Sequence, residues 1–296
     1  NKAIDLDPSK VVYRIDYAKI LYEVENYEAA ISYLFNVLED FPDHPKILSE
    51  IGIYYYRSGQ IAKYNSIKKT LINLPKKDES LYEFLIESSR LDDDLGGVID
   101  YSEKLVEIAP GRLDVRMDLA TTYIERESYA KAKVHLEEIK SRLDSYPKLN
   151  YLYARLNLLL GREDEAKKMA LEEIEENPLV KDGYLVLGDI FIRQNEFIKA
   201  REQYVKALQR DSKSVDAILG IAFVALKTNQ YDLAINQYQK ALELDKNNPK
   251  VYKLLGDAYR KIGQSQLAIP VYKQYLELSP NSKYKRKIMT YIETMQ

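Results

Sequence analysis

Prolines recur along this chain at a fixed interval. Pro8, Pro42, Pro110, Pro178 and Pro280 lie at multiples of 34 residues from one another. The segment AIDLDP that ends at the first of them is similar to the segment YLELSP that ends at the last. A period of about 20 to 50 residues is typical of arrays in which each unit packs against its neighbours. We therefore expect a tandem repeat array in place of a single globular core.

Anchored on these prolines, the period divides the chain into eight consecutive windows without any insertion or deletion. The windows are residues 11–44, 45–78, 79–112, 113–146, 147–180, 181–214, 215–248 and 249–282. Residues 1–10 match the end of a preceding unit, so we expect them to belong to its second helix. Residues 283–296 have the length of one further helix, which we expect to cap the array.

Small residues keep fixed positions within the windows. Positions 8 and 20 hold Ala18, Gly52, Ala120, Ala154, Gly188, Ala222 and Gly256, and Ala30, Ala132, Ala166, Ala200, Ala234 and Ala268. Apolar residues recur at spacings of three and four in both halves of a window, which predicts two amphipathic helices. The small residues would let the two helix axes approach closely, and aromatic residues at positions 11, 17 and 24 would fill the space around them.

The ends of the helices are also indicated. Position 15 is often Gly or Asn, which suits the turn after a first helix. The proline at position 32 ends the second helix and begins the link to the next unit.

This pattern resembles the tetratricopeptide repeat family over essentially the whole chain. The resemblance implies an all-α fold, a right-handed superhelical solenoid of antiparallel helix pairs. In that family the first helices line a concave groove, and the second helices lie mostly outside.

The window at 79–112 departs most from the pattern. Ile86 and Val98 replace the small residues, and residues 91–97 read LDDDLGG. We expect a distorted or loosened unit there. The three Asp residues at 92–94 are interpreted as compensating the dipole of the second helix, because a calcium loop requires alternating acids and a distant Glu.

Residues suited to catalysis or metal binding are scarce. The chain has no Cys, which excludes disulfides, thiolate nucleophiles and cysteine-bound zinc. His44 and His135 lie nearly three windows apart, and we expect both to be incidental surface residues. No phosphate-binding glycine loop or GxSxG elbow occurs, and carboxylates precede Lys at helix spacing, as in Glu163 and Lys167. We therefore expect no enzyme, no cofactor and no metal.

Charge and hydropathy argue against other classes of partner. The net charge of −2 argues against nucleic acid, and no apolar run reaches the roughly 18 residues of a membrane-spanning helix. The charge is uneven, because residues 249–296 carry nine Lys or Arg against three acids, a net of +6 that leaves −8 for the rest. The balance of charged and apolar residues predicts a soluble chain, and its compartment stays open between cytoplasm and periplasm.

The predicted groove is unusually apolar. The family resemblance places positions 2, 5, 9, 12 and 13 of the first helices in the groove, and many of these are apolar in the middle windows. A large exposed apolar stripe indicates an interaction surface, and the alternative is that these side chains pack against the next unit.

The last window is basic at these positions, which suits an acidic segment or a terminal carboxylate, with a solubilising cap as the alternative. The candidate partner-binding residues are Met117, Ile124, Tyr151, Arg155, Leu158, Leu185, Asp189, Ile192, Arg193, Leu219, Phe223, Leu226, Lys250, Lys253 and Arg260.

The leading hypothesis is a protein–protein interaction scaffold that binds a peptide or amphipathic helix of a partner protein in this groove. Two alternatives stay open: a structural array that self-associates through its N-terminal face, and the repeat segment of a larger multidomain protein. Family members that bind the carboxylates of chaperone tails carry Asn at position 6, which no window has. We therefore do not expect that ligand.

Overall fold

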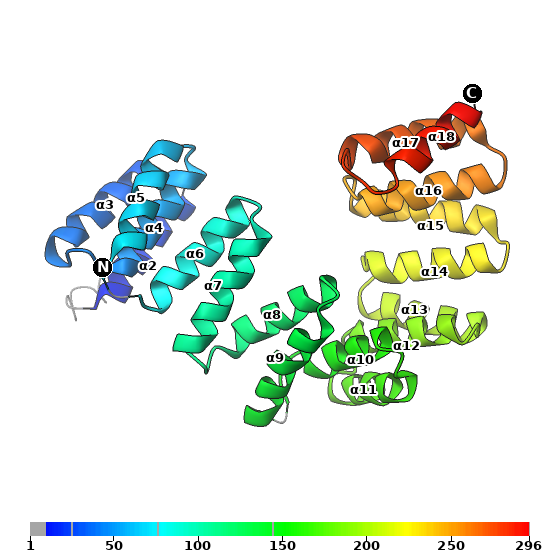
Figure 1. Ribbon diagram of the computed structural model, residues 1–296, viewed down its shortest axis with the longest axis horizontal. Helices are drawn as coiled ribbons and strands as arrows, with labels where there is room; N and C mark the ends of the chain where they lie inside the picture. The colour runs from blue at the N-terminus through cyan, green and yellow to red at the C-terminus, as the bar shows by residue number, and fades with distance from the viewer. Residues whose placement is uncertain (1–9, 25, 76, 144, 296) are drawn as a thin grey trace. The chain divides into compact units, whose positions relative to one another are not determined.

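The computed structural model describes residues 10–24, 26–75, 77–143 and 145–295. Within these ranges it contains seventeen α-helices and no β-strand (Figure 1). The all-α prediction is confirmed, and helices joined by short turns pack as antiparallel pairs. The predicted end of a preceding unit lies outside the described residues, apart from Lys10.

The helix bounds keep the 34-residue phase of the sequence. The first helices are α2 (Val11–Glu23), α4 (Pro45–Arg57), α6 (Glu79–Leu91), α8 (Leu113–Glu125), α10 (Leu149–Leu159), α12 (Asp182–Arg193), α14 (Val215–Lys227) and α16 (Pro249–Lys261). The second helices are α3 (Tyr27–Asp40), α5 (Ile61–Asn73), α7 (Leu95–Ile108), α9 (Tyr129–Arg142), α11 (Glu163–Glu176), α13 (Phe197–Arg210), α15 (Tyr231–Leu244) and α17 (Ser265–Leu278), and α18 (Lys285–Met295) follows them. Each of these first helices ends at position 13 of its window, and each second helix begins at position 17. We keep the division into eight repeat units and a C-terminal cap as a prediction.

The chain divides into two compact units, Asn1–Ile139 and Lys140–Gln296, and α9 spans the boundary. In the first unit, one apolar cluster joins α2 to α6 through buried side chains such as Leu34, Ile51 and Tyr64. In the second unit, α10 to α18 succeed one another side by side (Figure 1). The second unit is therefore held together by linked clusters between neighbouring helices, as in other repeat arrays.

The turn between paired helices has the same backbone conformation along the array. Position 15 has a positive φ in Gly59, Asp93, Glu127, Gly161, Asn195, Asn229 and Gly263. Gly and Asn adopt this left-handed conformation at low cost, which confirms their predicted role as turn residues. The proline at position 32 also has its predicted place, since α3 ends two residues before Pro42 and α17 ends two residues before Pro280.

Small residues at positions 8 and 20 lie where helices approach closely, as predicted. All six alanines at position 20 are 0% exposed. Gly188 at position 8 lies in a tight contact, because an added Cβ atom would lie 2.6 Å from the ring of Tyr204. Gly220, at position 6 of the next window, lies against the same ring, and its added Cβ would be 2.5 Å away. The Tyr204 ring therefore lies between α12 of its own pair and α14 of the next. Gly256 meets the ring of Tyr272 in the same way, at 2.7 Å.

The divergent window at 79–112 forms a helix pair with the common bounds, so the expected distortion does not reach the helix ends. Asp94 caps α7, since its Oδ1 accepts a hydrogen bond from the backbone N–H of Gly97 at 3.0 Å. Asp92 pairs with Lys68 at 2.9 Å. Asp94 therefore supports the start of α7, which agrees with part of the interpretation from the sequence, whereas Asp92 lies at the C-terminal cap of α6.

Candidate functional site

A cavity of about 470 Å³ lies among the first helices α10, α12, α14 and α16 of the second unit. We refer to it as the α10–α16 cavity. Nine of the candidate residues predicted from the sequence line it: Tyr151, Arg155, Leu158, Leu185, Asp189, Ile192, Leu219, Phe223 and Lys250. The structure thus brings together in one place residues that are spread over about a hundred positions of the chain.

These residues share one face of each first helix. On α12, Leu185, Asp189 and Ile192 are four and three residues apart, which places them on the same side of the helix. The lining residues of α10 have the same spacing. Because all the pairs keep one phase, the equivalent faces of successive first helices meet at the cavity.

The apolar part of the lining is only partly exposed. Phe223 is 36% exposed, and Ile192 and Leu219 are half-buried. Leu158 and Leu185 are only 5% and 7% exposed, so they pack mainly within the helix stack. For these two leucines the alternative of packing against the next unit describes the structure better than an exposed stripe.

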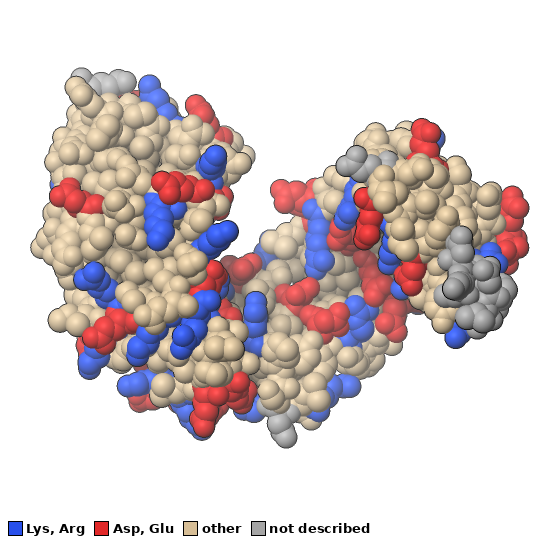
Figure 2. All heavy atoms as spheres, turned by 180° about the vertical axis from the view of Figure 1, so that it is seen from behind, with Lys and Arg blue, Asp and Glu red and all other residues tan. Residues whose placement is uncertain are grey.

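Charged side chains of both signs also line the cavity. Arg155 and Lys250 are the cations, and Asp189 and Asp216 are the carboxylates. Although Asp189 keeps contact with solvent, partial burial by the surrounding protein raises the pKa of its carboxyl, and Asp216 adds to this increase. The hydrogen bond from Tyr204 acts in the opposite direction. Figure 2 likewise shows acidic and basic side chains interspersed over the face in view.

Two tyrosine–aspartate pairs recur at equivalent positions. Tyr204 Oη donates a hydrogen bond to Asp189 Oδ1 at 2.5 Å, and Tyr272 Oη donates to Asp257 Oδ1 at 2.6 Å. Each pair joins position 24 of a second helix to position 9 of the first helix in the same window. In these two windows the tyrosine at position 24 therefore has a polar partner as well as an apolar contact.

Tyr238 occupies position 24 in the window between these two pairs. Position 9 of its window is Phe223, which has no acceptor atom. Tyr238 lines the α10–α16 cavity and is 0% exposed, and its hydroxyl is a buried polar atom without a hydrogen-bond partner. Burial and the nearby Asp257 carboxylate raise the pKa of Tyr238, so the hydroxyl keeps its proton and remains a donor.

The cavity also includes residues that the sequence prediction missed. They are Val186, Tyr204, Asp216, Gly220, Tyr238 and Leu254. Asp216 lies at position 2, which the family resemblance already places in the groove. A signal for the tyrosine hydroxyls was also present, because Tyr at position 24 coincides with Asp at position 9 in two windows.

Four of the remaining candidates lie away from this cavity. Met117 and Ile124 belong to α8 in the first unit, where Ile124 is buried at 2% exposure. Arg193 and Leu226 lie near the ends of α12 and α14 and do not line the cavity. Their part in binding stays a prediction.

The other two candidates, both basic residues of the last pair, are engaged within the chain. Lys253 Nζ lies 2.7 Å from Asp257 Oδ2. The Arg260 guanidinium lies 4.1 Å from the ring centroid of Tyr291 in α18, close enough for a cation–π contact. An acidic ligand at this end would have to displace these contacts. Lys250 is the basic candidate that lines the cavity.

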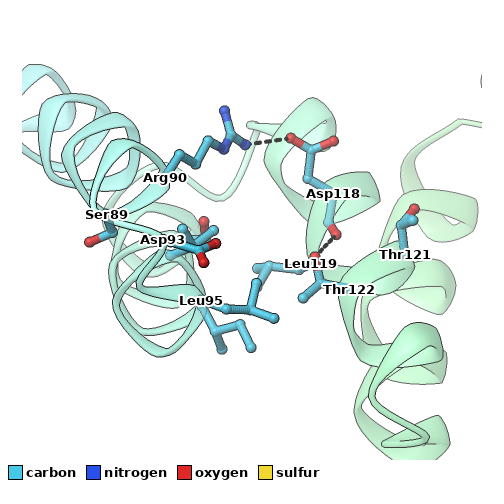
Figure 3. Close-up of a pocket in the computed structure, with 11 residues that line it drawn as sticks. Ser89, Arg90, Asp93, Leu95, Asp118, Leu119, Thr121 and Thr122 are labelled. Carbon is cyan, nitrogen blue, oxygen red and sulfur yellow. Dashed lines mark hydrogen bonds and ion pairs between the residues drawn. The ribbon is translucent and has the colours of Figure 1, made fainter. Parts of the chain in front are cut away.

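A second cavity, of about 350 Å³, lies beside the divergent helix pair in the first unit (Figure 3). Ser89 and Ser102 line it and occupy positions 11 and 24, where several other windows carry aromatic residues. Arg90 of α6 reaches across to Asp118 of α8 in an ion pair of 3.2 Å (Figure 3). Replacement of large rings by serine thus accompanies unfilled space between two helix pairs.

His135 is buried, and the expectation of a surface residue was wrong. It is 4% exposed, and its ring stacks on Tyr123 with centroids 5.7 Å apart. Its Nε2 lies 3.3 Å from Glu103 Oε1, which also accepts a hydrogen bond from Tyr123 Oη at 2.6 Å. Burial lowers the pKa of His135, and this outweighs the opposing effect of the Glu103 carboxylate.

Within the described ranges, no group of three or more His, Asp or Glu residues is placed to hold a metal ion. In the same part of the chain, none of the helices combines the length and apolar character needed to cross a membrane.

Family models match three segments of the second unit. One model, described as tetratricopeptide repeat, matches residues 182–214 and 249–282. Another, described as TPR repeat, matches residues 224–263. The matched segments include α12, α13, α15, α16 and α17 in full and only the last residues of α14.

Two solved structures share this fold. A tetratricopeptide repeat protein from Parabacteroides merdae aligns with a TM-score of 0.67 at 15% identity, over 82% of this chain and 96% of its own. Yeast Tom70 aligns with a TM-score of 0.64 at 18% identity, over 92% of this chain and 59% of its own. At these identities the likeness concerns the fold alone.

A curated relative is Protein O-mannosyl-transferase TMTC3 of Homo sapiens, which is 27% identical over 139 residues. The match covers 42% of this chain and 15% of that protein. The chain therefore corresponds to a small part of the relative's length.

Proposed function

Because the chain belongs to the tetratricopeptide repeat family, whose fold is that of a protein-interaction scaffold, we propose that it binds a segment of a partner protein in the α10–α16 cavity. The observation that carries this proposal is the convergence of residues from four successive first helices on one cavity. Half-exposed apolar side chains would supply binding energy there, and the charged residues between them would fix the orientation of the segment.

The extent of the cavity supports a polypeptide ligand. Packed helices lie about 8 to 10 Å apart, so a surface that runs from α10 to α16 covers three steps of this size, or roughly 25 to 30 Å. An extended chain advances about 3.3 Å per residue, so about eight residues would span that surface. A compact small molecule would touch only one or two of the helices.

We propose a binding role without catalysis. The hydrogen-bonded pair on the cavity, Tyr204 and Asp189, is poorly suited to proton transfer near neutral pH, because burial and the neighbouring carboxylate raise the pKa of the tyrosine further above its ordinary value. The transferase activity in the name of the human relative belongs to that protein, of which the matched part is a small share.

The test is a comparison of partner capture by variants of the whole chain. The double variant Ile192→Ala, Phe223→Ala truncates apolar side chains that line the cavity, and Leu185 stays intact because it is buried. The matched control is Ile198→Ala, which truncates a side chain on α13 that is 79% exposed. We expect the double variant to lose captured protein while the control retains it, with unchanged helicity in circular dichroism. Equal capture by all three chains would contradict the proposal.

A second candidate role is self-association through α2. Val12, Ile20 and Val24 are 55%, 58% and 67% exposed, which leaves apolar side chains uncovered at this end of the first unit. We expect Ile20→Lys to lower the average mass in light scattering at high protein concentration. A wild-type chain that stays monomeric over the whole concentration range would rule out this role.

A further inference from the structure

An unfilled hydrogen-bonding position lies on the α10–α16 cavity. The windows on either side of Tyr238 place an Asp carboxylate against the hydroxyl at position 24, at 2.5 and 2.6 Å. In the window of Tyr238 the aspartate is replaced by Phe223, and the hydroxyl has no partner. An unpaired buried hydroxyl is less favourable than a paired one, so the place of Tyr238 on a cavity points to an acceptor supplied from outside.

We propose that the partner segment binds in extended form and that one of its main-chain carbonyl oxygens accepts a hydrogen bond from the Tyr238 hydroxyl. This inference rests on the proposed function and specifies the conformation of the bound segment. The carbonyl would take the place that the Asp189 carboxylate holds beside Tyr204.

A neutral acceptor fits the charges around Tyr238 better than a carboxylate does. Asp189 and Asp216 already line the cavity opposite Arg155 and Lys250. The Asp257 carboxylate is near enough to Tyr238 to contribute to its raised pKa. A further negative charge at the hydroxyl would be repelled, whereas a carbonyl oxygen accepts the hydrogen bond without adding charge.

The requirement for a free carbonyl distinguishes an extended segment from a helix. The carbonyls in the interior of an α-helix accept hydrogen bonds from N–H groups four residues later. An extended segment has an unpaired donor and acceptor at every residue except proline. It could therefore offer a carbonyl to Tyr238, and its N–H groups could donate to Asp216.

Phe223 would control access to the hydroxyl. Its position is equivalent to that of Asp189, which contacts Tyr204 directly, and its side chain is 36% exposed. The Tyr238 hydroxyl is closed to solvent in the structure, so binding would include movement of the side chains that cover it. An apolar side chain of the partner would then pack against Phe223, Ile192 and Leu219.

The probe is a displayed library of random peptides about twelve residues long, selected against the whole chain, from which enriched peptides are made synthetically. Their dissociation constants are measured for the wild type and for Tyr238→Phe, Phe223→Asp and Ile192→Ala. We expect Tyr238→Phe to weaken binding about threefold to tenfold, the effect of one neutral hydrogen bond. Phe223→Asp should weaken binding more strongly, because the introduced carboxylate would accept the hydrogen bond of the Tyr238 hydroxyl within the chain and leave none for the peptide. Circular dichroism should show no gain of helix on binding, and a ¹³C-labelled peptide carbonyl should give an infrared shift that Tyr238→Phe abolishes.

The outcomes separate this inference from the proposed function. Peptides that are weakened by Ile192→Ala but bind Tyr238→Phe as tightly as the wild type would overturn the inference and leave the cavity as the binding site. Peptides that gain helix on binding would overturn the extended form. Peptides that lose binding when a single Asp or Glu is changed to its amide would overturn the carbonyl acceptor. Peptides indifferent to Ile192→Ala, or failure to enrich any peptide, would count against both proposals. Thermal unfolding of each variant shows that the fold is retained.

Discussion

The hydroxyl of Tyr204 donates a hydrogen bond of 2.5 Å to the carboxylate of Asp189, and the ring of the same tyrosine lies against Gly188 and Gly220. One side chain therefore fixes a polar group at the α10–α16 cavity and also fills the contact between two helix pairs. Its apolar body and its hydroxyl contribute to stability separately, so substitutions can separate the two.

Tyr204→Phe should lower the free energy of unfolding by about 1 to 2 kcal/mol, because the Asp189 carboxylate loses a hydrogen bond to a partly buried group. Tyr238→Phe should leave stability unchanged or raise it by up to about 1 kcal/mol, because it removes an unpaired buried hydroxyl. Urea denaturation followed by circular dichroism measures both. An equal loss in the two variants would show that the Tyr238 hydroxyl has a partner in solution.

Gly220→Ala should destabilise the second unit by about 1 to 2 kcal/mol. The added Cβ would lie 2.5 Å from the buried ring of Tyr204, and such overpacking costs more than the helix propensity of alanine returns. Gly111→Ala is the matched control, since no atom lies within 4 Å of its added Cβ, and it should change stability by less than about 0.5 kcal/mol. A stabilised Gly220→Ala would mean that the ring moves freely in its contact.

Asp94→Ala should lower stability by about 1 kcal/mol, because α7 loses the side chain that caps its N-terminus. Asp100→Ala, in the exposed middle of the same helix, is the control and should have little effect. The melting temperatures are measured with and without calcium. A rise on addition of calcium that disappears in Asp94→Ala would instead favour a metal-binding role for the acidic run.

His135 should make the chain sensitive to mild acid. Burial lowers its pKa in the folded state, while the unfolded state has the ordinary value of about 6.5. As the pH falls below about 6.5 the unfolded chain takes up a proton first, so stability is lost down to the folded-state pKa. The melting temperature of His135→Gln should therefore fall less than that of the wild type between about pH 7 and pH 5. An equal loss of melting temperature in the wild type and in His135→Gln would assign the acid sensitivity to other groups.

The helical architecture could be predicted because a single period governs it. The positions of Gly59 and Asn195 indicated the turns, and Pro42 and Pro280 indicated the ends of second helices. These signals act within a few residues of where they occur. The burial of His135 was not predictable in this way, because its partner Glu103 lies 32 residues earlier in the sequence.

The candidate site was predictable in its location and less so in its detail. The family resemblance placed Asp189 and Ile192 at groove positions, and the cavity includes both. Spacing could not show that Leu185 is buried, because that depends on the bulk of the neighbouring helices. It also could not show that Arg260 packs on Tyr291, since nothing in the periodic pattern of one helix specifies which side chain a later helix places against it.

The common helix bounds have a consequence for how such an array can change over time. A deletion or duplication of 34 residues would leave every turn in register, so the backbone permits gain and loss of units. The side chains are less permissive. Tyr204 at position 24 meets Gly220 at position 6 of the next window, whereas the residue that follows Tyr238 at position 6 is Leu254. Recombination could thus alter the number of units readily, but their order is restricted by which tyrosine can lie against which successor.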